Sequence, residues 1–246
     1  MKTATILRDG TRTPDPRLGC LFRPDDRNRQ FPLTAVVRWD REPVSRRWQC
    51  TQAMNQGEEG CCVAMGIAHE LFTTPAVLPE AVGVDWCVTH LYWPAQQKDP
   101  WPGGGYPGAL PRYEGTSLEA GLKVARHDLK LCAGYHWATT VRQVLVGIGH
   151  HRPAILALPW RERMSRPERS GQVRYRGPII GGHCLLADEV KLPRWPWQPI
   201  RIGLQQSWGR AHGIDGRVWM TEDDLALALA DGGQCAFLEG RQAIRL

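Results

Sequence analysis

The sequence predicts an α+β domain with two lobes, one helical and one built on an antiparallel β-sheet or barrel. Helical periodicity dominates the first half of the chain and strand-like runs dominate the second half. Hydrophobic residues make up 42% and charged residues 23% of the 246 positions, which is ordinary for a globular protein. Helices followed by antiparallel strands are typical of the α+β class. A cleft between two such lobes is a common place for a functional site.

Three helices are predicted in the first half. Residues 62–74 carry apolar side chains at helical spacing, with further apolar residues broadening the stripe, which predicts a mostly buried helix. A second helix is predicted over 83–97. Thr116 and Glu119 have the spacing of a capping box, which predicts a third helix that ends near residue 126.

Strand signals follow from residue 130 onward, with short helices between them. Thr221 has the position of a helix cap before the run EDDLALALA. The predicted strands are 130–136, 153–159, 182–191, 200–208, 216–220 and 234–239, and the helices of this half lie near 140–148 and after Thr221.

Residues 1–30 differ in composition from the remainder. They are rich in Arg, Asp and Pro and lack apolar periodicity. We therefore predict an extended arm over 1–30, lying on the surface of the domain or of a partner, and one folded domain over 31–246.

Charge and cysteine content exclude several classes of function. The formal net charge is +6, but the arginines are scattered and no nucleic-acid-binding motif is present, so no nucleic-acid partner is expected. No stretch approaches the ~20 apolar residues of a membrane span, and no membrane partner is expected. None of the eight cysteines forms a CxxC pair, so no metal or cofactor is expected. The first residues lack a signal-peptide core, which predicts synthesis in a reducing cytoplasm with most thiols free.

Cys62 has the sequence context of a nucleophilic thiol. Thiol catalysis needs an ionisable cysteine, a histidine to accept its proton and a group that orients the histidine. Cys62 stands where the predicted helix 62–74 begins, and the N-terminus of a helix lowers the pKa of a thiol. Gln56, just before the glycine turn, is placed to donate its amide to an oxyanion together with the backbone N–H of Cys62.

These motifs resemble those of the papain-like cysteine peptidases. The run Gln56-Gly57-Glu58-Glu59-Gly60-Cys61-Cys62 is similar to that family's glutamine, glycine turn and nucleophile. Gly181-Gly182-His183 matches the strand that carries its histidine, and Gln206-Ser207-Trp208-Gly209 resembles its Asn-Ser-Trp-Gly. The three motifs occur in the family's order, and the separation of 121 residues between positions 62 and 183 is close to the expected spacing.

The resemblance covers residues 31–240 and implies roles for each element. Cys62 is implied as nucleophile, His183 as base, Gln206 as the group that orients it and Gln56 as oxyanion donor. Trp208 is implied to shield the contact between Gln206 and His183 from water. Cys61, Cys184 and His69 are interpreted as packing residues.

The Pro/Gly-rich segment 98–115 is long for a connecting loop, and this length favours a functional role. Its Gly103-Gly104-Gly105-Tyr106-Pro107 stretch resembles the segment that lines the family's substrate cleft, which implies substrate binding at Gly104 and Gly105. The run Glu-Gly-Thr-Ser-Leu at 114–118 is similar to bacterial and bacteriophage members.

Three departures from the family pattern bear on activity. Gln206 replaces asparagine and adds one methylene, which displaces the histidine ring unless the backbone compensates. Glu58 and Glu59 place negative charge near the thiol and oppose its ionisation. Val63 replaces the usual aromatic residue, and the family's propeptide is not expected because only some 30 residues precede the domain.

The sequence therefore predicts a thiol hydrolase that cleaves peptide or related amide bonds, with proteins or cell-wall peptides as substrates. The alternative is a catalytically weak or inactive papain-fold protein that serves as a structural or binding component of a bacteriophage tail or virion, with the arm binding virion proteins. An enzyme carried on the phage particle would satisfy both interpretations.

Overall fold

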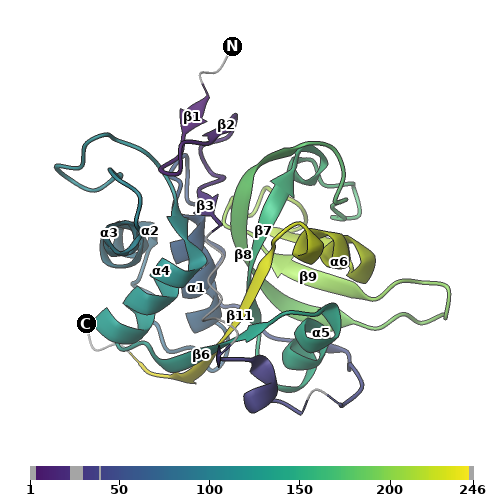
Figure 1. Cartoon of the computed structure of the whole chain (residues 1–246). Helices are drawn as coiled ribbons and strands as arrows, with labels where there is room; N and C mark the ends of the chain where they lie inside the picture. The colour runs from purple at the N-terminus through teal and green to yellow at the C-terminus, as the bar shows by residue number, and fades with distance from the viewer. Residues whose placement is uncertain (1–3, 23–29, 39, 244–246) are drawn as a thin grey trace.

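The computed structural model describes residues 4–22, 30–38 and 40–243, and it has two lobes (Figure 1). Helices α1 to α4 lie on one side, and a seven-stranded sheet with α5 and α6 lies on the other. Buried apolar side chains form two clusters, one between the helices and one face of the sheet and the other on the opposite face of the sheet with α5 and α6. The predicted α+β fold with two lobes is confirmed.

The helical lobe is organised around α1, which spans Cys62–Leu71. All ten residues of α1 are buried, as the broad apolar stripe predicts. The predicted helix over 83–97 forms as one continuous stretch, with a π-helical turn in its middle. The elements are α2 (Val84–Trp86), η3 (Cys87–Tyr92), α3 (Trp93–Lys98), α4 (Leu118–Lys123) and the π-helical η4 (Val124–Asp128).

The cap of α4 lies one residue later than predicted. Ser117 is the N-cap, and its hydroxyl accepts a hydrogen bond of 3.2 Å from the backbone N–H of Ala120. The Thr116 hydroxyl instead donates to the buried carboxylate of Asp99 at 2.6 Å, so it is unavailable as a cap.

The sheet lobe contains the predicted strands in antiparallel order β10-β9-β8-β7-β11-β6, with β4 paired to β8. Within the described residues, β10 and β6 end this order without pairing to each other, so the sheet is open and the barrel form is not found. The elements are β4 (Arg46–Arg47), β6 (Cys132–Ala138), α5 (Val141–His150), β7 (Ala154–Arg161), β8 (Ile179–Lys191), β9 (Arg201–Gln205), β10 (Arg217–Thr221), α6 (Glu222–Ala230) and β11 (Gln234–Arg241).

Several short elements lack a signal in the sequence, because two or three residues are too few for periodicity. They are strands β1 (Thr5–Ile6), β2 (Arg12–Thr13), β3 (Cys20–Leu21) and β5 (Thr116–Ser117), and the 3₁₀ turns η2 (Leu33–Ala35) and η5 (Glu162–Ser165). Within the part of the chain described, no helix has the length and apolarity needed to cross a bilayer.

The N-terminal segment lies along the boundary between the lobes (Figure 1). Its strand β3 pairs in parallel with β5 of the helical lobe, and Gly19 forms a bridge with Gly182 of β8. A surface position was predicted for the arm over 1–30, of which residues 1–3 and 23–29 lie outside the described part of the chain. In the described part, Leu18, Cys20 and Leu21 are 0–2% exposed. The prediction missed this because the three apolar residues have no periodic pattern.

Candidate active site

Cys62 is the first residue of α1, and its side chain is completely buried. Burial raises the pKa of the thiol, and the nearby backbone N–H groups of Cys184, Gly19 and the first helical turn lower it in part. The first of these groups belongs to strand β8, in the residue that follows His183. The glycine at position 66 permits the close packing of α1 on β8, since a Cβ there would lie 2.9 Å from the Cys184 sulfur.

His183 is buried in β8 and is held through one of its ring nitrogens. Its Nε2 lies 2.8 Å from Oε1 of Gln206. Because the amide oxygen only accepts, Nε2 carries the proton and Nδ1 is the basic nitrogen. Nδ1 is buried and has no hydrogen-bond partner among the described residues. The imidazole is therefore oriented with a free lone pair.

Two tryptophans enclose the imidazole. The Trp208 ring lies 4.7 Å from the His183 ring between centroids, and Trp160 makes an edge contact at 4.9 Å. Trp208 is 6% exposed. These rings keep water from the contact between His183 and Gln206, which strengthens it.

Gln56 is fixed between the two lobes. Its Oε1 accepts from the Ser207 hydroxyl at 2.5 Å, and its backbone N–H donates to the Ser207 carbonyl at 2.8 Å. Its amide nitrogen donates to the carbonyl of Glu59 at 2.6 Å and to that of Arg17 at 3.2 Å. The amide thus already binds a carbonyl oxygen, supplied by the N-terminal arm.

The arm fits against the site with almost no clearance. A Cβ on Gly19 would lie 2.0 Å from the carbonyl oxygen of Gly60, and one on Gly182 would lie 2.1 Å from that of Cys20. Real Cβ atoms do not approach so closely. The glycines at 19 and 182 allow the two backbones to meet.

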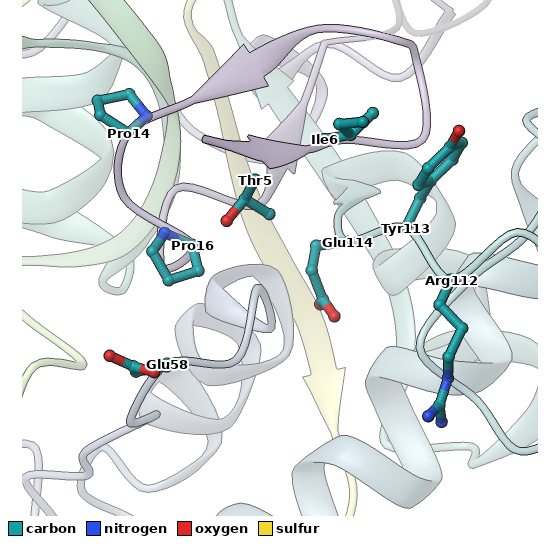
Figure 2. A pocket seen from close by; sticks show the side chains of 8 residues that line it. All are labelled: Thr5, Ile6, Pro14, Pro16, Glu58, Arg112, Tyr113 and Glu114. Atoms are coloured by element: carbon teal, nitrogen blue, oxygen red, sulfur yellow. The ribbon is translucent and has the colours of Figure 1, made fainter. Parts of the chain in front are cut away.

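Residues 14–17 of the arm separate two surface pockets. One, of about 640 Å³, is lined by Glu58, by strand β1, by Pro14 and Pro16 of the arm and by residues 112–114, as Figure 2 shows. The other, of about 460 Å³, lies beside Trp208 and also includes Glu58. Arg17 stacks on Trp208, with its guanidinium carbon 4.1 Å from the ring centroid. Pro14 and Pro16 of the arm line both pockets, so the arm lies between the two hollows.

A buried ion pair fastens the arm farther from Cys62. The Arg8 guanidinium lies 3.4 Å from the Asp99 carboxylate, with side chains that are 2% and 0% exposed. Arg8 also donates to the carbonyl of Gly103 at 2.9 Å. The loop 98–115 therefore holds the arm.

Gly104 and Gly105 are engaged within this loop. The Gly104 N–H donates to the carbonyl of Pro111 at 3.1 Å, and the Gly105 N–H donates to Oε1 of Gln96 at 2.8 Å. Neither N–H is available in this conformation to pair with a substrate backbone.

Burial favours the neutral forms of Cys62 and His183. It raises the pKa of Cys62 to about 11, and the N–H groups around the sulfur oppose this only in part. The helix terminus predicted the opposite direction. Burial also lowers the pKa of His183 to about 4, against the smaller effects of Gln206 and Asp15. The arm contributes to this burial because it covers the sulfur, so the structure shows a covered site.

All eight cysteines are free thiols. Within the described residues, no group of three or more His, Cys, Asp or Glu side chains is arranged to hold a metal ion.

The structure resembles solved cysteine proteases. Xylellain, a cysteine protease from Xylella fastidiosa, superposes with a TM-score of 0.64 at 14% identity, over 96% of this chain and 99% of xylellain. A structure of the mite allergens Blo t 1 and Der p 1 gives 0.59 at 12% identity, over 91% and 76% of the two chains. Digestive procathepsin L2 from Tenebrio molitor gives 0.55 at 14% identity, over 91% and 79%. No family model and no curated protein sequence matches the chain. The fold is therefore papain-like, and these neighbours lend no support to a virion or tail component.

Sequence reasoning missed the arm residues at the site. Arg17 and Gly19 contact Gln56 and Cys62, yet no motif marks them. The only available signal was the cluster Leu18-Gly19-Cys20-Leu21, an apolar run inside an otherwise polar arm.

Proposed function

We propose that this chain is a cysteine peptidase with Cys62 as nucleophile, His183 as general base and acid, Gln206 as the group that orients His183, and Gln56 as oxyanion donor. The observation that carries the proposal is the position of the Cys62 sulfur. It lies at the start of a buried helix and near the backbone of Cys184, the residue that follows His183 in β8, and the His183 imidazole is held through Nε2 by Gln206.

The chemistry follows from the roles of these groups. Nδ1 of His183 takes the thiol proton, and the sulfur bonds to the carbonyl carbon of the peptide bond. The C–N bond then breaks, and the imidazolium gives its proton to the leaving amine. Water, deprotonated by His183, attacks the thioester and releases the carboxylic acid and the thiol.

The amide of Gln56 supports the oxyanion role through its present hydrogen bond. It donates to the carbonyl of Arg17 at 3.2 Å, and a substrate oxygen would replace that carbonyl. The Ser207 hydroxyl fixes the orientation of the amide through Oε1. A donor fixed in advance stabilises the charge that develops during attack.

Catalysis requires the arm to leave the groove. Cys62 has no exposed surface while the backbone of Gly19 lies near its sulfur. We therefore propose that the described conformation is an inhibited one, and that protein or peptide substrates, including cell-wall peptides, bind where residues 14–19 now lie.

Labelling with a fluorescent iodoacetamide or an epoxide probe tests the proposal. The full chain should label slowly at Cys62, and a variant with Arg17→Ala and Gly19→Ala should label Cys62 rapidly. Adding His183→Ala to this opened variant should abolish the fast labelling. Cys50, a partly exposed free thiol, provides the internal reference.

The complete burial of Cys62 favours one alternative, a chain that keeps the fold without turnover. In that case Cys62 of the opened variant would react no faster than Cys50, and no fluorogenic peptide would be cleaved. That result would overturn the peptidase.

A further inference from the structure

The connection between β8 and β9 forms a projecting turn that the proposed catalysis does not use. In Figure 1 it extends from the sheet lobe on the side away from the helical lobe. Its sequence from position 191 to 201 is KLPRWPWQPIR, with three cationic residues, three prolines and no acidic residue. Prolines restrict the backbone, so the turn keeps its shape when it meets a ligand.

Two tryptophans stand at the tip of this turn. Trp195 is 48% and Trp197 is 76% exposed, although tryptophan is usually well covered. Their rings stack in parallel, 5.4 Å apart between centroids and 3° apart in plane. The facing sides of the two rings cover each other, so the pair presents an apolar edge and cannot clamp a planar ligand between the rings.

Residues of the same turn line a pocket of about 500 Å³ with a cationic lining. Lys191, Arg194 and Arg201 line it, together with Gln172 and Gln198, and no carboxylate contributes. Among the described residues none of these three cations forms an ion pair. The nearest acidic groups are engaged: Glu222 accepts from the backbone N–H of Ile200 at 3.2 Å, and Glu189 pairs with Arg217 at 3.0 Å.

We propose that this turn docks the protein on an anionic phospholipid bilayer, with lipid phosphates in the cationic pocket and the tryptophan pair at the level of the headgroups. Tryptophan favours the interface between water and hydrocarbon, where its ring is buried and its N–H stays hydrated. Cationic side chains near an anionic leaflet each add about a fivefold gain in affinity. Such peripheral contact needs no spanning segment.

The bilayer is favoured over an acidic protein by the two exposed tryptophans beside the cations. An acidic peptide would be bound by the cations alone, whereas tryptophan side chains that are 48% and 76% exposed suit the interfacial region of a membrane. The Arg194 guanidinium lies 5.7 Å from the centroid of the Trp195 ring, so charge and apolar surface adjoin, as they do at the level of the headgroups.

Sedimentation of the full chain with sucrose-loaded vesicles tests the proposal. Vesicles with 30% phosphatidylglycerol in phosphatidylcholine should bind the protein at 0.1 M salt, and pure phosphatidylcholine vesicles should bind it at least tenfold more weakly. Lys191→Gln with Arg194→Gln should lower the affinity about 25-fold. Trp195→Ser with Trp197→Ser should lower it at least tenfold.

Matched controls come from the same lobe. Arg163→Gln with Arg166→Gln removes the same charge from exposed positions elsewhere, and Leu227→Ser removes an apolar side chain that is 55% exposed. Both should bind as the unaltered chain does. Equal losses in the controls, or no vesicle binding by the unaltered chain, would overturn the proposal. Binding of polyglutamate that depends on Lys191 and Arg194, without vesicle binding, would assign the pocket to an acidic protein instead.

Discussion

The amide oxygen of Gln206 lies 2.8 Å from Nε2 of His183, so the extra methylene relative to asparagine does not prevent the contact. The backbone compensates: the Gln206 N–H donates to the carbonyl of Gly216 at 2.9 Å, which fixes where the longer side chain starts. In this chain the distance from the backbone at position 206 to the His183 imidazole therefore suits a glutamine side chain.

Replacing Gln206 by alanine should remove the hydrogen bond that orients the imidazole. Turnover of a fluorogenic peptide by the opened variant should fall about 100-fold, the effect of a misplacement of about 1 Å. Gln205→Ala, which removes an amide bound only to backbone oxygens at 3.3 Å, should cost less than fivefold. Equal losses in both variants would show that position 206 has no special role.

Replacing Gln56 by alanine should affect turnover and alkylation differently. Loss of one oxyanion donor should lower kcat about 100- to 1000-fold, whereas alkylation by iodoacetamide forms no oxyanion and should be nearly unchanged. Gln52→Ala is the control, because its amide binds only the backbone of Glu80, at 2.9 Å, on the surface. If Gln56→Ala slows alkylation as much as turnover, Gln56 acts by holding Cys62 in place.

Replacing Gly19 by alanine should displace the arm, because its Cβ would lie 2.0 Å from the Gly60 carbonyl oxygen. Backbone cannot yield as a flexible side chain does, so the arm must move. Labelling of Cys62 should rise at least tenfold, and the melting temperature of the domain should fall, because Leu18, Cys20 and Leu21 are buried in the closed conformation. Gly134→Ala, where a Cβ meets nothing within 4 Å, should leave labelling unchanged.

Acid should release the arm. The pKa of His183 is lowered to about 4 in the covered state from an ordinary value of 6.5, so the closed form is favoured above pH 6.5 and loses this advantage as the pH falls towards 4. Full restoration of the ordinary pKa would correspond to about 3 kcal/mol, and release of the arm restores a part of it, because Trp160 and Trp208 also bury the imidazole. His212, whose pKa is likewise lowered to about 4, acts in the same direction. Asp15 opposes the lowering for both histidines, and Arg17 favours it.

The measurement is the ratio of Cys62 labelling rates between the unaltered chain and Gly19→Ala, at pH 5.0 and 7.5. Division by the rate of Gly19→Ala cancels the direct effect of pH on the thiol. The ratio should be higher at pH 5.0. A ratio that is constant with pH would show that titration of His183 does not drive release of the arm.

Long periodic segments were predictable because their patterns reflect burial directly. The apolar stripe of 62–74 became α1, and the run at 182–191 became most of β8. The papain-like motifs predicted that 62 and 183 belong to one catalytic site, and this stays a prediction; the structure places the Cys62 sulfur near the backbone of Cys184, which follows His183. These features depend on side chains near in sequence or on a known pattern.

The state of the site was not predictable in the same way. The surroundings of the Cys62 thiol include Gly19, which lies 43 positions earlier in the sequence. The glycines at 19, 60 and 182 are needed because backbones of distant segments approach each other closely there, and the sequence alone does not show these approaches. The cap at Ser117 was also misplaced, because the competing bond of Thr116 to Asp99 spans 17 residues. Both errors arise from contacts between distant segments.

The direction in which the arm meets the sulfur has a chemical consequence. Gly19 presents its amide hydrogen to the Cys62 sulfur, and an amide hydrogen offers no electrophilic carbon to attack. The carbonyl that Gln56 holds belongs to Arg17, two residues before Gly19. The arm therefore meets the Cys62 thiol through an N–H and not through a carbonyl carbon, as a reversible plug. Intact-mass measurement of the purified protein should accordingly find the chain uncut between positions 13 and 22, even after long storage at neutral pH.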